Sequence, residues 1–329
     1  MEVTAVYVYP VKSCKGVKVD TAQVTELGFK YDREWMVVDK KNVCVTLRTV
    51  PTLGFIQPEI SSDGTLGLNA PDMPSITVPT QTGGKTLNVK IFGLTIPAAD
   101  QGDEVAQWLS QFLKEDGMRL VHYVPTCGRI ADDGNDRWVS RLKSSKEWQV
   151  KFPDEYPWLI ATDASLKALN ASLTKEELPE GKTITMSRFR PNIVVGNTKA
   201  WEEDQWGELH VGSVNFHCVK ACGRCAIPTI DPETAEFQGT TNNPIPFLTK
   251  KRDFGRGPLF GQAAVSFYTS GTVSVGDKVN VVSRRSEYEQ AEDRRAPPPA
   301  WLPIRQTMWL GVGVVAAFAV ALHIRQKKN

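Results

Sequence analysis

The strongest constraint on the fold is a succession of short, β-branched runs in the first hundred residues. Glycine, proline, aspartate or a Lys-Asn pair separates the runs, which read VTAVYVYPV, EWMVVDKKNVCVTL, TLGLN, SITVPT and TLNVKIFGLTI. Runs of this kind, bounded by turn residues, predict strands. Residues 39–42 predict a hairpin turn between strands at 35–38 and 43–47. The first part of the chain is therefore expected to be mainly β.

One amphipathic helix interrupts this pattern. In GDEVAQWLSQFLKEDG, the apolar residues recur at helical spacing, as Val105, Trp108, Leu109, Phe112 and Leu113. Asp103 is placed to cap this helix and Gly117 to end it.

A second unit follows the polar stretch at 127–151. DASLKALNASL predicts a short helix capped by Thr162 or Asp163, and strand patterns resume in ITMSRFRPNIVVG, ELHVGSVNFHCVK, AVSFYTS and TVSVGDKVNVV. Neither an internal repeat nor a βαβ alternation is visible, which disfavours a doubly wound sheet. We expect an α+β protein that is mainly β, with two β-barrel-like domains at 1–125 and 126–282, because barrels protect strand edges.

The C-terminal segment predicts a membrane anchor. Residues 283–305 are charged and then proline-rich, which is typical of a linker. Met308–Ile324 carries no acid, lysine or arginine, and as a helix it would be roughly 26 Å long, close to the thickness of a bilayer core. We expect a transmembrane helix at 306–325 and a basic tail at 326–329. A helix packed on the protein surface is the alternative.

Charge and cysteine content exclude two classes of protein. The formal net charge is +2 and acidic and basic residues are interleaved, so no nucleic-acid surface is expected. Six cysteines in 329 residues are too few for a disulfide scaffold. The opening MEVTAVYVYP already has a strand pattern, and no signal peptide or Arg-rich transit peptide precedes it. Secretion is therefore not expected, and the thiols are expected to be reduced.

Three cysteines and a histidine fall within HCVKACGRC, as His217, Cys218, Cys222 and Cys225. The spacing Cys-x3-Cys-x2-Cys occurs in radical-SAM iron–sulfur sites, but those belong to an early loop of a large α/β barrel. A zinc site is disfavoured because His217 and Cys218, adjacent on a strand, point to opposite faces. Buried, inert thiols explain Cys218 well.

A fourth interpretation is a single thiolate on a transition metal that a cofactor holds. Cys225 follows a Gly-Arg step and precedes a proline-rich turn, a partly open and electropositive place. Thiolate is a soft ligand suited to such a metal, and Arg224 is a charge-assisted donor for an anionic cofactor. The residues alone leave these alternatives open.

Further motifs resemble one known family. YPVKSCKG at 9–16, YDREWMVVD at 31–39, SRFRPNIVV at 187–195, GPLFGQ at 257–262 and CGRCAIPTIDPET at 222–234 together resemble the MOSC family, the domain shared by molybdenum-cofactor sulfurases and related proteins. The resemblance extends over roughly residues 2–282 and includes the amino-terminal MOSC β-barrel domain. Within the family, the chain is similar to the branch of mitochondrial amidoxime-reducing components of animals.

The resemblance implies roles for particular residues. Cys225 matches the molybdenum ligand and is the candidate catalytic residue. The positions that hold the molybdopterin and its phosphate are matched by Lys12, Ser13, Arg33, Arg190, Asn192, Gly223 and Arg224. Cys222 is expected to be a spectator, and Asp231 to set a turn or to contact the cofactor. Glu155-Tyr156 stand where close relatives carry small hydroxyl residues.

The function implied by the resemblance is a molybdenum-cofactor-dependent reductase of N-hydroxylated compounds such as amidoximes and hydroxylamines. No GxGxxG follows a strand, so direct binding of a pyridine nucleotide is not expected. The family implies electrons from cytochrome b5 and its NADH-dependent reductase. The expected location is the mitochondrial outer membrane facing the cytosol, with endoplasmic reticulum and peroxisome as alternatives. A non-catalytic carrier of the cofactor or of sulfur is the rival function.

Overall fold

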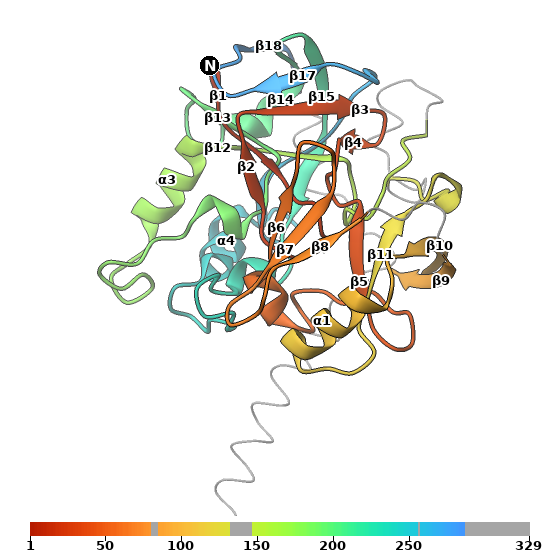
Figure 1. The fold of residues 1–329 in the computed structure, drawn as a ribbon. Coiled ribbons are helices and arrows are strands. Elements are labelled where there is room, and N and C mark those ends of the chain that lie inside the picture. The colour runs from red at the N-terminus through yellow and green to blue at the C-terminus, as the bar shows by residue number, and fades with distance from the viewer. Residues whose placement is uncertain (80–84, 132–146, 256, 287–329) are drawn as a thin grey trace, which may run out of the picture.

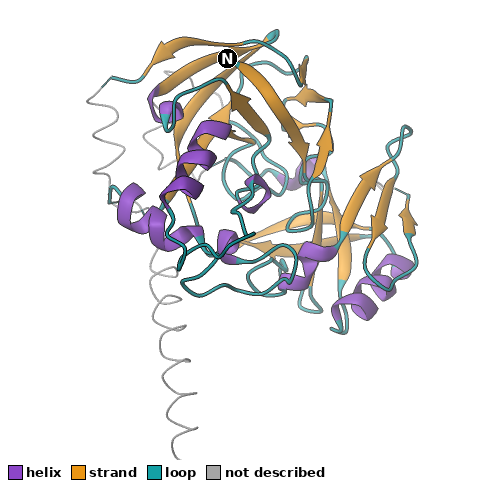
Figure 2. Cartoon of the chain, turned by 90° about the vertical axis from the view of Figure 1, so that its left-hand side faces the viewer, coloured by secondary structure: helices purple, strands orange, loops and turns teal. Residues whose placement is uncertain are grey.

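The computed structural model describes residues 1–79, 85–131, 147–255 and 257–286. Figure 1 shows β-sheets with few helices at their edges, and Figure 2 shows two groups of strands with the N-terminus beside the larger group. The expectation of a mainly β protein with curled, barrel-like sheets is confirmed at this level.

The largest sheet among the described residues has eight strands in the order β18-β14-β15-β16-β12-β13-β1-β2. Its strands are β1 Glu2–Val8, β2 Val17–Val19, β12 Trp158–Thr162, β13 Ile193–Gly196, β14 Trp206–Val211, β15 Val214–Gly223, β16 Leu259–Val265 and β18 Val279–Arg284. Antiparallel pairing dominates, but β12 and β13 are parallel.

Three smaller sheets complete the fold. The spatial orders are β5-β11-β10-β9, β17-β3-β4 and β6-β7-β8. Their strands are β3 Thr21–Thr25, β4 Gly28–Phe29, β5 Trp35–Val38, β6 Gln57–Ile60, β7 Leu66–Asn69, β8 Ile76–Val78, β9 Thr86–Ile91, β10 Leu94–Asp100, β11 Arg119–Tyr123 and β17 Thr272–Ser274.

The helices cap or connect these sheets. The α-helices are α1 Asp103–Leu113, α3 Asp163–Ser172 and α4 Pro244–Arg252, and the 3-10 turns are η1 Pro51–Phe55, η2 Pro125–Cys127, η3 Met186–Arg188, η4 Glu202–Gln205 and η5 Ile227–Thr229. The predicted anchor at 306–325 lies outside the described residues. Within the described ranges, no helix is both long and apolar enough to cross a membrane.

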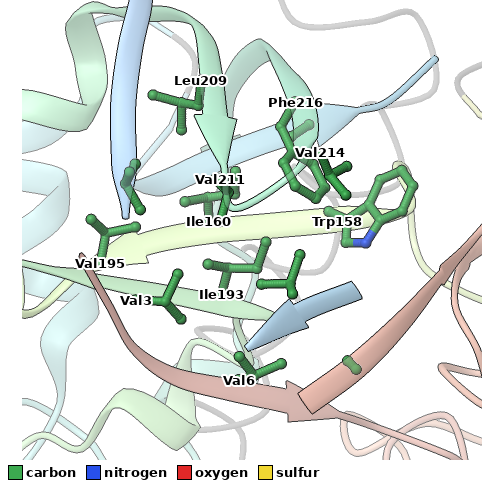
Figure 3. Close-up of a cluster of buried hydrophobic side chains, with 14 of the residues drawn as sticks. Val3, Val6, Trp158, Ile160, Ile193, Val195, Leu209, Val211, Val214 and Phe216 are labelled. Carbon is green, nitrogen blue, oxygen red and sulfur yellow. The ribbon is translucent and has the colours of Figure 1, made fainter. Parts of the chain in front are cut away.

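The start of the chain is built into the large sheet beside strands of the second unit. β1 pairs with β13 through Val3↔Val195 and Val6↔Ile193, and β3 pairs with β17 in a separate three-stranded sheet. Figure 3 shows Val3 and Val6 in the same core as Ile160, Ile193 and Val195. The first thirty residues therefore share a core with residues 158–279, although the sequence pattern groups them with residues 35–125.

Most local predictions hold, but the strand expected at 43–47 is wrong. That segment forms only the isolated bridges Val38↔Cys44 and Val43↔Lys90. The turn at 39–42 forms, with Asn42 at φ 58° and Asp39 N donating to Val43 O at 2.9 Å. Helix α3 is capped by Thr162, whose side chain accepts a hydrogen bond from Ser165 N. The βαβ unit β12-α3-β13 is present. This unit was not expected, because a long polar connection separates α3 from β13 and hides the βαβ alternation in the sequence.

The expected boundaries of α1 are wrong at both ends. Asp103 is the first helical residue rather than the cap, which is Gly102 at φ 101° without a side-chain bond. The Asp103 carboxylate instead accepts from Arg119 at 2.8 Å. The helix ends at Leu113, and its C-cap Lys114 takes a left-handed conformation at φ 55°, three residues before Gly117.

A buried carboxyl group lies beneath the start of α3. Glu203 is 0% exposed, and its Oε2 accepts from Ser165 Oγ at 2.8 Å and from Thr162 Oγ1 at 3.1 Å. Burial raises the pKa of Glu203 from 4.5 to about 7. The unfolded chain releases this proton near pH 4.5 and the folded protein only near pH 7, so stability is lost as pH rises through that window.

We predict that Glu203→Gln removes this loss. A pKa rise from 4.5 to about 7 corresponds to a stability difference on the order of 3 kcal/mol, gained by the variant relative to wild type between pH 4.5 and 7. Denaturant unfolding across this range measures the difference. Glu202→Gln is the control, because a side-chain hydrogen bond from Arg284 lowers the pKa of Glu202 and its removal must change stability with the opposite sign. A flat difference curve for Glu203→Gln contradicts the prediction.

Candidate functional site: a cation-lined cavity with two cysteines

One cavity brings together all eight residues that the resemblance selects. Its walls come from the segment after β1, the turn before β5, the loop before β12, the segment between η3 and β13, and the end of β15. The eight are Lys12, Ser13, Arg33, Arg190, Asn192, Gly223, Arg224 and Cys225. Their shared position is a finding of the structure, and their roles as ligands stay a prediction.

Three cavity residues have a left-handed backbone without being glycine. Ser13 has φ 71°, Arg33 has φ 49° and Arg190 has φ 57°. The conformation costs roughly 1–2 kcal/mol per L-residue and is found disproportionately at functional sites. Hydrogen bonds from Arg33 N to Tyr9 O at 2.7 Å and from Arg190 N to Ser187 O at 3.2 Å stabilise two of the turns.

Asn192 holds the cavity wall together rather than offering its amide to a ligand. Nδ2 donates to Tyr7 O at 3.2 Å and to Asp32 Oδ1 at 3.0 Å. Oδ1 accepts from Arg33 Nη1 at 3.1 Å and from Leu159 N at 3.2 Å. These contacts use both donors and both acceptor positions of the amide. The expectation that Asn192 pairs with a pterin ring is therefore not supported by its contacts, and it is a positioning residue for Arg33.

Tyr9 lies between two guanidinium groups. The Arg33 and Arg190 guanidinium carbons are 4.3 Å and 4.4 Å from the centre of its ring, within cation–π range. Gly16 allows this packing, since a Cβ there would come within 2.5 Å of the Tyr9 ring. Burial raises the pKa of the Tyr9 phenol, so Tyr9 is a neutral spacer between the two cations.

The two arginines differ in how fully their donors are used. Arg33 donates to both Asp32 carboxylate oxygens, at 2.8 Å and 2.6 Å, and to Arg190 O at 3.2 Å. Arg190 donates to Cys14 O at 2.7 Å, and no second acceptor for it occurs among the described residues. Arg190 therefore has guanidinium donors to spare for an anionic ligand.

The cysteine cluster separates into a buried thiol and two cavity thiols. Cys218 is 5% exposed, and burial raises its pKa to about 12. His217 is half-buried and packs edge-on against Phe267 at 5.1 Å. Cys222 and Cys225 are both partly exposed and line the cavity. Across the described ranges, no group of three or more His, Cys, Asp or Glu side chains is arranged to hold a metal.

Arg224 contacts the sulfur of Cys222 rather than that of Cys225. Its Nη1 lies 3.0 Å from Cys222 Sγ, and its Nη2 donates to Phe189 O at 2.7 Å. Its Nε is buried without a partner among the described atoms. Cys225 Sγ accepts a long hydrogen bond of 3.5 Å from Ile227 N. Cys222 is thus the hydrogen-bond partner of Arg224, and its expected role as a spectator of the metal stays a prediction.

Asp231 sets a turn away from the cavity. Its Oδ1 accepts from Glu233 N at 2.9 Å, which confirms the predicted Asx bond, and its Oδ2 accepts from Asn242 Nδ2 at 2.7 Å. Asp231 is absent from the cavity lining. Its expected alternative role as a cofactor contact is therefore not supported.

Glu155 and Tyr156 lie on the cavity wall, and both contact a lysine outside the lining that the sequence analysis missed. Glu155 pairs with Lys220 at 3.3 Å, and the Lys220 ammonium lies 5.2 Å from the centre of the Tyr156 ring. Tyr9, Asp32 and Lys220 had no signal of their own in the sequence, because each belongs to the site through its contacts.

Comparison with known proteins identifies the family. The MOSC N-terminal beta barrel domain matches residues 1–116 and the MOSC domain matches residues 147–280. Mitochondrial amidoxime reducing component 2 of Bos taurus is 36% identical over 291 residues, 84% of this chain and 82% of that protein. Mitochondrial amidoxime-reducing component 1 of Homo sapiens is 34% identical over 296 residues, 86% of this chain and 83% of that protein.

The chain belongs to the MOSC-domain proteins that have an amino-terminal MOSC β-barrel domain. Its homologues within that class are the mitochondrial amidoxime-reducing components. A solution structure of a Bordetella bronchiseptica protein covers 32% of this chain at 19% identity with a TM-score of 0.27, which is too weak a likeness to support an argument about the fold.

We predict that Asn192→Ala loosens the wall that carries Arg33. Four hydrogen bonds are lost, at about 1 kcal/mol each, and the Leu159 amide loses its acceptor. Hydrogen exchange at Leu159 should accelerate, and the free energy of unfolding should fall by about 2–4 kcal/mol.

Asn170→Ala is the matched control for this variant. The Asn170 side chain also makes four hydrogen bonds, to Leu166, Thr183 and twice to Ile184, but it is not part of the cavity lining. It should lower stability by a similar amount without changing exchange at Leu159. Unchanged exchange at Leu159 in Asn192→Ala would show that the amide does not hold this wall.

Proposed function

We propose that this protein is a molybdenum-cofactor-dependent reductase of N-hydroxylated compounds, such as amidoximes and hydroxylamines. The observation that carries the proposal is a partly exposed thiol, Cys225, on the wall of a cavity lined by four cationic side chains. The four are Lys12, Arg33, Arg190 and Arg224. Homologues named amidoxime-reducing components, at about 35% identity over most of the chain, indicate the substrate class.

The cavity residues fit a phosphate-bearing cofactor with a soft metal. The buried Nε of Arg224 has no partner among the described atoms, and Arg190 has donors to spare. Guanidinium groups form strong, charge-assisted hydrogen bonds with phosphate. A cysteine sulfur on the same wall is a suitable ligand for a transition metal. The guanidinium donors and the cysteine sulfur of the cavity together suit an anionic organic ligand that carries a metal.

Each part of the chain has a defined role in this proposal. The molybdenum cofactor, when bound, supplies the two-electron chemistry that converts an N–OH group and two protons into N–H and water. Cys225 would hold the metal through its sulfur. Lys12, Ser13, Arg190, Gly223 and Arg224 would hold the phosphate and pterin. Asn192 and Asp32 orient Arg33, which fixes the position of Arg190 through its carbonyl oxygen.

Electrons must come from a partner in this proposal, because the chain has no dinucleotide-binding motif. We propose cytochrome b5 and its NADH-dependent reductase as the donors, in line with the resemblance described above. A common membrane would raise their effective concentration. The predicted tail anchor would place the protein there, with the mitochondrial outer membrane facing the cytosol as the proposed location.

Turnover with a defined substrate tests the proposal against the carrier alternative. Protein produced in a host that makes the cofactor is assayed with benzamidoxime, NADH, cytochrome b5 and its reductase, and its molybdenum is measured by elemental analysis. A reductase contains molybdenum and turns over repeatedly. Transfer of the cofactor to an apo-acceptor without turnover identifies a carrier, and protein without molybdenum excludes both.

We predict that Cys225→Ser abolishes activity while the fold survives. A hydroxyl is a poor ligand where a soft thiolate is required, so bound molybdenum and benzamidoxime reduction should each fall by more than about 100-fold. The circular dichroism spectrum should be unchanged, because Cys225 is partly exposed.

Cys222→Ser is the matched control, since both cysteines lie on the same wall. This change alters only the partner of Arg224 and should retain most of the molybdenum. If Cys222→Ser loses the metal and Cys225→Ser keeps it, the assignment within the cluster is reversed.

We predict that deletion of residues 305–329 releases an active protein from membranes. The deletion includes the apolar segment Met308–Ile324 and removes none of the residues that line the cavity, which fall between Lys12 and Ala263. Membrane fractionation should find the full chain in the pellet and the truncated chain in the supernatant, with unchanged benzamidoxime turnover when the partners are in solution. A truncated chain that remains in the pellet would place the anchor elsewhere.

A further inference from the structure

Lys12 already has a negative partner inside the cavity. Lys12 is 4% exposed, and its Nζ donates to Phe152 O at 2.9 Å and to the carboxylate of Asp154. The Asp154 side chain is 50% exposed, and both residues line the cavity. The lysine is thus fixed in the wall, while the aspartate side chain faces open space.

The backbone beside Asp154 is held by a buried arginine. Arg129 is 6% exposed, and it donates to Lys151 O at 3.1 Å, to Pro153 O at 2.6 Å and to Asp154 O at 2.8 Å. Because these bonds fix the main chain, Asp154 can leave Lys12 by rotation of its side chain alone. No movement of the loop is required.

Positive charge around Asp154 exceeds what one carboxylate neutralises. Desolvation by the surrounding wall acts to raise the pKa of Asp154, but Lys12 outweighs it, helped by Arg48 and Arg129, and the pKa lies well below its ordinary value. Asp154 is therefore an anion. A phosphate monoester, as a dianion, would neutralise more of this positive charge than one carboxylate does.

A buried ammonium is strongly destabilising without an anion beside it. Lys12 therefore needs a negative partner both before and after a ligand enters the cavity. In the structure Asp154 is that partner, and an entering phosphate group is the natural replacement because it brings more charge and more acceptor oxygens.

We propose that Asp154 is an exchangeable counter-ion that occupies the phosphate position at Lys12 until a phosphate-bearing ligand displaces it. The proposal rests on the proposed function for the identity of that ligand. Exchange makes binding weaker than the cations alone would allow, and it keeps the empty cavity folded. Asp154 is a positioning residue in this scheme and touches neither the metal nor the substrate.

Binding of inorganic phosphate to the apoprotein tests the exchange without any turnover. The full chain is produced in a host that makes no molybdopterin, and phosphate is titrated by calorimetry at constant ionic strength. Asp154→Asn should bind phosphate about tenfold more tightly than wild type, a change equivalent to ~1.4 kcal/mol. Lys12→Met should remove this binding in both backgrounds.

Asp103→Asn is the matched control for the loss of one negative charge. Asp103 also pairs with a cation, Arg119 at 2.8 Å, but it lies outside the cavity and should leave phosphate affinity unchanged. Equal or weaker phosphate binding by Asp154→Asn, together with lower stability, would show that Asp154 is a fixed structural partner and would overturn the proposal.

Crystals of the wild-type apoprotein grown with and without phosphate give a second test, which decides the question even if Asp154→Asn does not fold. The expected result is phosphate at Lys12 Nζ with the Asp154 side chain rotated away. Phosphate bound while Asp154 stays on Lys12 contradicts exchange. Because these experiments require neither metal nor turnover, their failure leaves the reductase proposal to its own test.

Discussion

The pairing of β1 with β13 is the constraint on which the rest of the site depends. It sets Tyr7 against Asn192, whose carbonyl oxygen accepts from Tyr7 N at 2.8 Å, and so brings two segments more than 180 residues apart into register. The chain that leaves β1 supplies Lys12 and Ser13, and the chain that enters β13 supplies Arg190. Backbone hydrogen bonds between strands are too numerous to shift by one residue without turning the apolar side chains of β1 out of the core. A rigid sheet thus fixes the spacing of the cations.

Concentrating cations in a partly buried cavity is costly, and the structure offsets this cost with specific partners. Arg33 has the Asp32 carboxylate and Lys12 has Asp154, while Tyr9 separates Arg33 from Arg190. Left-handed conformations at Ser13, Arg33 and Arg190 add backbone strain in the same place. A large apolar core, to which both ends of the folded chain contribute, supplies the stability that makes this arrangement tolerable. The cavity is therefore preorganised for an anion by parts of the protein that never touch it.

The sequence predicted what depends on local pattern and missed what depends on long-range contacts. The apolar periodicity of 105–113 was sufficient to predict α1. The role of Asp103 was misassigned, because its carboxylate accepts a hydrogen bond from Arg119 on strand β11 instead of capping the helix. The resemblance selected eight residues that do share one cavity, although their separations along the chain give no sign of it. Asp154 and Arg129 were missed because nothing in a single sequence indicates which charges meet. The amide of Asn192 was expected to contact a ligand for the same reason, as its four protein partners come from three separate segments.

The interleaving of the two chain ends has a consequence for biosynthesis. β3 is completed by β17, and Val3 exchanges backbone hydrogen bonds with the turn at 276–277. A ribosome that has released only the first half of the polypeptide has therefore exposed β1 and β3 without their neighbours. Unpaired strand edges of this kind are prone to aggregation, so the nascent chain needs protection until nearly all of it has emerged. Insertion of any prosthetic group between the two halves must then be a post-translational event.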